Sequence, residues 1–261
     1  MEYDPLKNRL EKVIALYPSV RKLIFHLFRL FFLRQRYVFK EINNLFENTD
    51  KIRLYDAGAG FCQYSDFILA NWKNSISFAT DLKTDYLKSY ANYAAEKYPG
   101  RFFYKSADLQ TYLPAHKYDL SLAIDILEHI EDDVSTLKNI LDALKPNGYL
   151  IISTPSNLDK AAEFTSEHIR SGYNKQELEN KLQQVGFRIV KSIYTYGPFG
   201  SLSWKLMLKF PMQLIQKKLF LFLPVYYLLV YPIGELFMRL DMQMKNKQGT
   251  GILLVAQKPE N

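Results

Sequence analysis

The chain has 261 residues, of which 48% are hydrophobic and 15% aromatic, and this is enough to bury the core of one ordinary domain. A single cysteine excludes an internal disulfide and a multi-cysteine metal site, and it favours a reducing compartment. The net charge of +7 is uneven, because the flanks 1–53 and 198–248 each carry +5 and the segment between them carries −3.

Strand and helix patterns alternate through the middle of the chain. The apolar runs that predict strands are 52–58, 75–82, 102–109, 118–126, 149–155, 188–197 and 250–259. The amphipathic segments that predict helices between them are 63–72, 84–98, 132–144 and 174–187. This alternation predicts an α/β fold with a doubly wound, mostly parallel, seven-stranded sheet.

Two segments fall outside the alternation. The beginning of the chain predicts a basic, aromatic helical extension, and a hydrophobic, basic insertion separates the last two predicted strands. We therefore expect three parts, namely the extension 1–50, a core formed by 51–197 together with 249–261, and the insertion 198–248.

Glycines and carboxylates stand at the carboxyl ends of the first four predicted strands. They are Asp56, Gly58, Gly60, Asp81, Asp108 and Asp125. Because ligands of open α/β sheets bind at the carboxyl ends of the strands, we expect the four acids to line one edge. Four carboxylates disfavour the pyrophosphate of a dinucleotide, and Gln63 stands where the pattern G-x-G-x-x-G needs its third glycine. The edge favours a nucleoside with a cationic tail, such as S-adenosylmethionine (SAM), with Asp81 suited to the ribose hydroxyls and Asp56 to the cation.

Five blocks of the chain resemble, in order and spacing, the class I SAM-dependent methyltransferases, in particular those that O-methylate quinone precursors and other lipid-like small molecules. The blocks are DAGAG at 56–60, ATDL at 79–82, SADL at 106–109, YDLSLAIDILEHI at 118–130 and LKPNGYLIISTPS at 144–156. The resemblance covers roughly 51–197 and 249–259, and one departure is Cys62, which stands where the family often has a glycine.

The resemblance implies SAM as the cofactor. Asp81 would bind the ribose, Leu82 would pack on the adenine, Asp108 would bind the adenine amine, and the backbone at 58–60 would approach the methionine part. The implied cofactor-binding residues are Asp56, Ala57, Gly58, Gly60, Asp81, Leu82, Ala107, Asp108, Leu109, Ile124 and Asp125.

Catalysis of methyl transfer mainly requires that an acceptor atom be held in line with the methyl group while water is excluded. A hydroxyl acceptor would also benefit from a base, and the candidate catalytic residues are His129, His168 and Glu128. Asp125, Glu128 and His129 have the spacing i, i+3, i+4, which would place them on one face of a helix, where they could bind a divalent cation. The same segment resembles that of metal-dependent O-methyltransferases. A metal-free polar loop is the preferred interpretation, and a divalent cation is the alternative.

The two basic flanks are rich in leucine and aromatic residues. Residues 20–40 predict a helix on which Lys22, Arg29, Arg36 and Lys40 form one stripe. In the insertion, the longest uncharged run, 219–234, contains two prolines, and we expect it to be too short and too broken to span a membrane. The flanks would fold over the sheet as a lid, or would also contact a membrane surface through 20–40 and 199–240.

An apolar lid favours a hydrophobic acceptor, such as a lipid, a quinone precursor or a polyene, methylated at oxygen. One alternative is an RNA methyltransferase, but nucleic acid is a disfavoured partner because the basic residues are embedded in Leu/Phe runs. Another alternative is a membrane-attached SAM-binding protein without catalysis. The first twenty residues lack the pattern of a signal peptide, so we expect a cytoplasmic protein or one bound peripherally at the inner face of the membrane.

Overall fold

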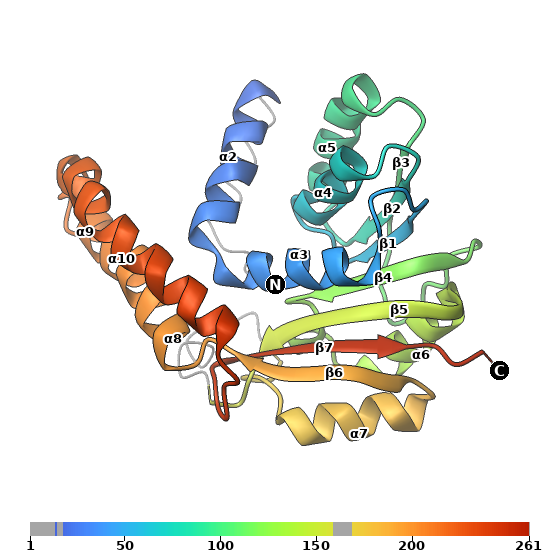
Figure 1. Cartoon of the computed structure of the whole chain (residues 1–261). Coiled ribbons are helices and arrows are strands. Elements are labelled where there is room, and N and C mark those ends of the chain that lie inside the picture. The colour runs from blue at the N-terminus through green and yellow to red at the C-terminus, as the bar shows by residue number, and fades with distance from the viewer. Residues whose placement is uncertain (1–13, 15–17, 159–168, 261) are drawn as a thin grey trace.

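The computed structural model describes residue 14 and residues 18–158 and 169–260. At its centre lies a seven-stranded sheet with the order β3-β2-β1-β4-β5-β7-β6 (Figure 1). The strands are β1 (Arg53–Ala57), β2 (Ile76–Asp81), β3 (Phe102–Ser106), β4 (Tyr118–Ile124), β5 (Leu144–Pro155), β6 (Arg188–Thr195) and β7 (Gly251–Gln257). Only β7 runs antiparallel to its neighbours, β5 and β6. The predicted mostly parallel α/β fold is confirmed.

Helices cover both faces of the sheet. The helices α6 (Asp133–Ala143) and α7 (Lys175–Val185) pack on one face, and α3 (Leu33–Leu45), α4 (Gln63–Asn71) and α5 (Thr84–Lys97) pack on the other. The core is apolar on both sides of β1, because Leu54 and Tyr55 are buried in opposite layers. This two-sided burial fits the continuous apolar runs in the sequence.

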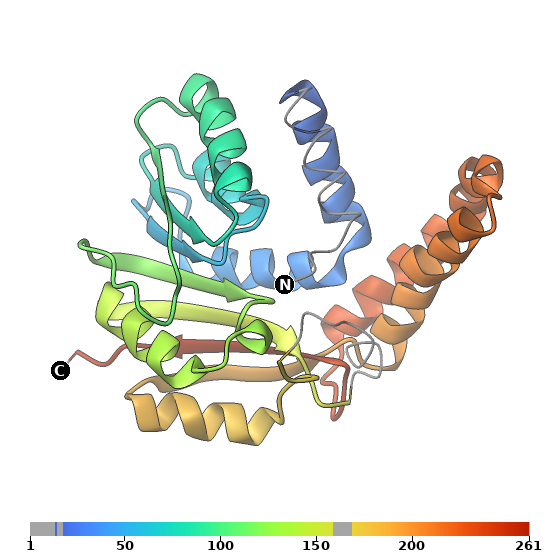
Figure 2. The ribbon, with the colours of Figure 1, turned by 180° about the vertical axis from the view of Figure 1, so that it is seen from behind.

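Residues 20–40 form two helices instead of the single predicted one. The helix α2 (Pro18–Phe31) ends where Phe32 adopts an extended conformation, and α3 then turns along the sheet (Figures 1 and 2). Arg36 stabilises the break, because its guanidinium donates to the backbone oxygens of Arg29 (3.1 Å) and Leu30 (2.9 Å) at the end of α2. The prediction of one continuous basic stripe is therefore wrong.

The insertion forms a helical hairpin that projects from the sheet (Figures 1 and 2). Its first limb consists of α8 (Pro198–Trp204), a π-helix (Lys205–Lys209) and α9 (Phe210–Gln216), and its second limb is a 3₁₀ turn (Phe220–Phe222) followed by α10 (Leu223–Gln243). Because α8 follows the carboxyl end of β6, the hairpin leaves the same edge of the sheet at which the glycine turn after β1 lies.

The expectation that two prolines break the insertion is wrong. Pro224 lies in the first turn of α10, where its missing N–H is not needed, and the helix continues through Pro232. Among the described residues, the one helix long and apolar enough to cross a membrane, by length and composition alone, is Phe220–Gln243, with a mean hydropathy of 1.6. Only 6% of its most apolar window is buried within the protein, so α10 is not an ordinary core helix.

Candidate functional site

The chain turns sharply after β1, at Gly58 and Gly60, whose φ angles are +76° and +51°. The backbone N–H groups of Gly58 and Ala59 both donate to the carbonyl oxygen of Thr80, at 2.8 and 3.0 Å, and tie the turn to β2. A Cβ atom at Gly58 would lie 2.5 Å from Cγ1 of Ile126, whereas a Cβ atom at Gly60 would meet no described atom within 4 Å. Gly58 is therefore required by packing, and Gly60 leaves the backbone open to a ligand.

Cys62 keeps the turn intact without the glycine that the family often has. It precedes α4 in the left-handed conformation, with φ of 61°, and its side chain is fully buried beside Ala59 and Leu69. Left-handed backbone is uncommon for a residue other than glycine, so tight packing holds this one in place. The small thiol fits the space that the turn leaves.

The carboxylate of Asp81 is fixed at the end of β2 by two backbone donors. The N–H of Gly60 donates to Oδ2 and the N–H of Lys83 donates to Oδ1, each at 2.9 Å. Leu82 beside it is 54% exposed, and the N–H of Ala107 donates to the backbone oxygen of Asp81 at 3.2 Å. The structure therefore brings the turn, the predicted ribose acid and the start of the segment after β3 together.

The segment after β3 separates into an exposed acid and a buried apolar residue. Asp108 is exposed, and its Oδ1 accepts a hydrogen bond from the N–H of Gln110 at 2.9 Å. Leu109 is buried in the core. On β4, Ile124 is half-buried at the last position before Asp125.

Asp56 lies behind the turn instead of on the open edge. It is only 2% exposed, and its Oδ2 accepts a hydrogen bond from the hydroxyl of Ser65 on α4 at 2.7 Å. Ser65 in turn accepts from the hydroxyl of Ser77 at 2.8 Å. Burial raises the pKa of the Asp56 carboxyl to about 6. The structure thus shows a buried polar link from β1 to α4, and contact between Asp56 and a cationic ligand stays a prediction. Ala57, the last residue of β1, is likewise buried.

Arg34 is a site residue that the sequence did not reveal. It lies in the first turn of α3, and its guanidinium forms an ion pair with Oδ2 of Asp125, just past the end of β4. Asp125 adopts a φ of 52°, and its N–H donates to the backbone oxygen of Ser153. Its second oxygen, Oδ1, is buried and has no hydrogen-bond partner among the described residues. The edge therefore contains a buried carboxylate oxygen to which a bound cation could pair.

The three predicted catalytic residues have different surroundings. Glu128 is 1% exposed, and its Oε2 accepts from the hydroxyl of Thr154 at 3.0 Å, so it braces the loop after β4 against β5. His129 is partly exposed at the end of a short 3₁₀ helix, Leu127–His129. His168 lies outside the described residues.

The three residues of the alternative metal site do not have the helical arrangement that the sequence predicted. Asp125 precedes the 3₁₀ helix in the left-handed conformation, so it does not share a helix face with Glu128 and His129. Throughout 18–158 and 169–260, no group of three or more His, Cys, Asp or Glu side chains is placed to hold a metal ion.

An aromatic cluster connects the N-terminal extension to the glycine turn. The ring of Phe61, within the turn, stacks on Tyr86 of α5 at 5.0 Å between centroids. Phe28 of α2 lies 5.9 Å from Phe61, and Phe32 lies 5.3 Å from Phe28. The extension therefore contributes aromatic rings to the surface beside the open backbone of Gly60. One of them, Phe32, is 38% exposed.

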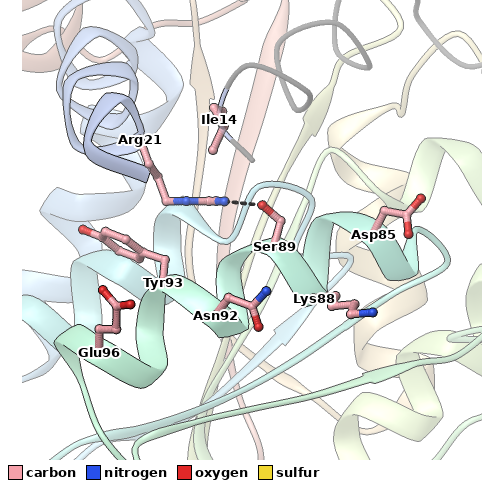
Figure 3. A pocket seen from close by; sticks show the side chains of 8 residues that line it. All are labelled: Ile14, Arg21, Asp85, Lys88, Ser89, Asn92, Tyr93 and Glu96. Atoms are coloured by element: carbon pink, nitrogen blue, oxygen red, sulfur yellow. Dashed lines mark hydrogen bonds between the residues drawn. The ribbon is translucent and has the colours of Figure 1, made fainter. Parts of the chain in front are cut away.

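A separate cavity of about 320 Å³ lies between α2 and α5 (Figure 3). Arg21 closes one side, where its Nη2 donates to the hydroxyl of Ser89 at 2.6 Å and its guanidinium packs over the rings of Tyr90 and Tyr93. None of the predicted site residues that the structure describes lines this cavity, so it is not the candidate cofactor site.

Comparison with known proteins agrees with this geometry. Residues 32–192, more than half of the chain, match the family described as a methyltransferase domain. The chain belongs to this methyltransferase family. The resemblance to the SAM-dependent methyltransferases is thereby confirmed, and the matched residues end before the hairpin begins.

Individual relatives are distant. A trans-aconitate 2-methyltransferase of Agrobacterium fabrum is 27% identical over 118 residues, which are 45% of this chain and 44% of that protein. A ubiquinone biosynthesis O-methyltransferase of Rickettsia canadensis is 24% identical over 129 residues, 49% of this chain and 53% of that protein. The chain thus spans about half the length of the curated relatives it matches.

A solved structure supports the same fold. The phosphoethanolamine N-methyltransferase 2 of Haemonchus contortus, in complex with S-adenosyl-L-methionine, superposes with a TM-score of 0.59 at 19% identity. The match covers 84% of this chain and 51% of that one.

Proposed function

We propose that the protein is a SAM-dependent methyltransferase that transfers a methyl group to an oxygen of a hydrophobic small molecule. The observation that carries the cofactor part is the Asp81 carboxylate, which the backbone N–H groups of Gly60 and Lys83 hold at the end of β2. Two backbone bonds leave acceptor capacity on both oxygens, which suits the two hydroxyls of a ribose.

The residues present fit SAM in three further ways. Gly60 leaves open space beside the backbone, Leu82 offers an exposed apolar surface for the adenine, and Oδ1 of Asp125 is a buried acceptor suited to a cation. SAM supplies a methyl group that its sulfonium already activates. The protein must therefore bind and orient the two reactants and exclude water.

The aromatic cluster supports a hydrophobic acceptor. Phe28, Phe32 and Phe61 lie beside the open turn, where a polar acceptor would lose its hydration without gaining hydrogen bonds. One curated relative is named for O-methylation in ubiquinone biosynthesis and another for trans-aconitate, so the relatives alone do not choose between apolar and polar acceptors. The rings beside Gly60 favour the apolar one.

A hydroxyl acceptor needs a proton acceptor, and His129 is the better placed of the two described candidates. Glu128 is buried and engaged with Thr154, whereas His129 is partly exposed just beyond Asp125 at the same edge of the sheet. We assign the role of base to His129 and a bracing role to Glu128.

The test is incubation with methyl-labelled SAM and, separately, a total lipid extract and total RNA, followed by mass spectrometry of the labelled products. We expect label in an apolar product of the lipid extract, and stability of that label to mild alkali would distinguish an ether from an ester. Asp81→Ala is the inactive control. Label in RNA alone would contradict the acceptor class, and calorimetric SAM binding without any labelled product would favour a non-catalytic SAM-binding protein.

A further inference from the structure

The half of the hairpin far from the sheet carries a continuous apolar face. Along α10 and the turn before it, large side chains recur every three or four residues and point outward, with Leu221 at 78% and Leu228 at 76% exposure. Val225 and Leu236 continue the same stripe, and nothing in the described part of the chain covers it. A soluble monomer rarely leaves so long an apolar surface in water, so this face indicates an apolar partner.

The charge of the hairpin identifies the kind of partner. Residues 205–234 contain four lysines, at 205, 209, 217 and 218, and neither aspartate nor glutamate. All four lysines are exposed. A second copy of the chain would bring eight lysines and no acid together across the contact, which disfavours self-association. An anionic lipid surface offers both an apolar layer and negative headgroups, and so complements both features.

Two backbone carbonyls of the hairpin are satisfied by side chains instead of water. Pro211 has no N–H, so it cannot bond to the carbonyls of Leu206 and Met207, which lie five and four residues earlier. The hydroxyls of Tyr226 and Tyr227, on the opposite limb, donate to these two carbonyls at 2.8 and 2.9 Å. Unsatisfied carbonyls are tolerable in water but costly in an apolar layer, so these bonds suit a hairpin that leaves water.

The two limbs form a rigid arm. A Cβ atom at Gly234 would lie 2.4 Å from Sδ of Met207, so the limbs approach as closely as a glycine allows. Phe31 at the end of α2 contacts Tyr227 at 5.0 Å and Tyr231 at 6.2 Å between ring centroids. The arm is thus held at a fixed position relative to the extension.

Polar contacts at the root of the arm, the part of α10 from Glu235 to Asp241, limit how far the arm can enter a bilayer. Glu235 of α10 forms an ion pair with Arg36 at 2.7 Å, and Asp241 accepts from the hydroxyl of Tyr37. The part of the second limb beyond Glu235, 220–234, has about fifteen residues and a length of about 22 Å, short of the ~30 Å hydrocarbon core. Lying in the interface fits this length, and spanning would separate these polar groups from their partners.

From this geometry we propose that the α8–α10 hairpin is a monotopic arm that lies in the interface of an anionic bilayer. The outer face of α10 contacts the acyl chains and the lysines contact the headgroups. The proposal goes beyond methyl transfer and does not depend on which acceptor the enzyme uses.

The test is flotation of the full chain with vesicles of phosphatidylcholine alone and with vesicles that also contain phosphatidylglycerol. We expect the protein to float with the anionic vesicles and to be released by alkaline carbonate. Leu221→Asp/Leu228→Asp should abolish flotation, while Val190→Asp, at an exposed valine on the edge strand β6, should float like wild type. Lys217→Gln/Lys218→Gln should weaken binding by roughly tenfold or more, and added salt should weaken it in wild type.

Three results would overturn the proposal. One is no flotation of the wild type, and another is wild-type flotation by Leu221→Asp/Leu228→Asp. The third is a dimer in light scattering that this double variant dissociates while vesicle binding is absent, which would make the face an interface between copies. In addition to these three, resistance to carbonate extraction would contradict the interfacial arrangement, since it would show an arm inserted more deeply into the bilayer. Because no methyl transfer is measured, failure here is distinguishable from failure of the proposed enzyme activity.

Discussion

The cofactor edge of the sheet and the far half of the hairpin differ in which side chains the protein itself provides with partners. At the edge, the carboxylate of Asp81 accepts hydrogen bonds from two backbone N–H groups. In the hairpin, the hydroxyls of Tyr226 and Tyr227 satisfy two backbone carbonyls of the opposite limb, but the apolar side chains of the far half are left uncovered. The edge therefore presents carboxylates that the protein itself holds in place, whereas the arm presents an apolar face that nothing in the described part of the chain buries.

The arm joins the rest of the protein at Asp241, which is fully buried at the root of the arm. Its Oδ2 accepts from the hydroxyl of Tyr37 (2.8 Å) and the N–H of Tyr196 (3.1 Å), and its Oδ1 accepts from the N–H of Gly200 (3.0 Å) and the amide of Asn246 (3.2 Å). Four donors replace the water that a buried carboxylate loses. Burial and the nearby Asp241 raise the pKa of the Tyr37 hydroxyl well above its usual range.

Breaking this junction should have the largest effect on stability. Asp241→Ala removes the carboxylate that accepts from two buried backbone N–H groups, those of Tyr196 and Gly200, while the hydroxyl of Tyr37 keeps the backbone oxygen of residue 241 as its acceptor. The loss should cost about 3–5 kcal/mol of the free energy of unfolding. Urea denaturation measures this loss. Asp241→Asn keeps one oxygen acceptor and should lose less. An alanine variant as stable as wild type would mean that the arm and the sheet are not coupled through this residue.

A second substitution, at Asp81, should weaken ligand binding at the cofactor edge and leave the arm unchanged. Asp81→Ala removes the carboxylate that suits the ribose hydroxyls and should weaken binding of S-adenosylhomocysteine at least about 100-fold, since two hydrogen bonds to a charged group are lost. Calorimetric titration measures this effect. Asp85→Ala, at an exposed acid in the first turn of α5, is the matched control and should bind normally. Equal affinity in both variants would contradict the assignment of the ribose site.

Local sequence patterns were sufficient to predict the edge. The glycine turn, Asp81 and the alternation of strands and helices all depend on residues close together in the chain, and the structure places each within a few positions of its predicted boundary. The periodicities of two and 3.6 residues record burial within a single element. This is why the sheet and its carboxyl edge could be predicted.

The additions could not be predicted in the same way, because their conformation depends on distant partners. The break at Phe32 follows from Arg36 bonding back to α2, and the ion pair between Arg34 and Asp125 joins positions 91 residues apart. The continuity of α10 through Pro232 depends on packing against the opposite limb at Gly234. Composition indicated that both flanks are apolar and basic, but only the tertiary contacts show that α3 is buried and the arm is not.

A smaller effect should appear in the pH dependence of stability. The folded-state pKa of Asp56, about 6, lies above its ordinary value of 3.8, so the folded protein binds more protons between these values than the unfolded one. This contribution to stability is fully present below pH 3.8 and is lost as pH rises through 6. Asp56→Asn removes the dependence while keeping an acceptor for Ser65, so it should gain about 1–2 kcal/mol relative to wild type between about pH 5 and pH 8.

Denaturant titrations of both proteins at several pH values measure this difference. A constant difference across the range would mean that Asp56 titrates normally and that its burial is relieved by motion of α4.

The smallest predicted effect concerns the charge that the extension adds to the edge. Arg34→Gln removes a positive charge next to Asp125, so a sulfonium-bearing ligand should be favoured over an uncharged one. Two unit charges ~8 Å apart interact by about 1 kcal/mol at an effective dielectric constant of ~40, and we take this as the size of the effect. The ratio of the Kd for S-adenosylhomocysteine to the Kd for SAM should therefore rise about three- to tenfold. Lys22→Gln, on exposed α2, is the control and should leave the ratio unchanged. Because the ratio compares two ligands on one protein, a general weakening of the fold cancels, and an unchanged ratio in Arg34→Gln would show that the Arg34–Asp125 pair lies outside the field of the bound cation.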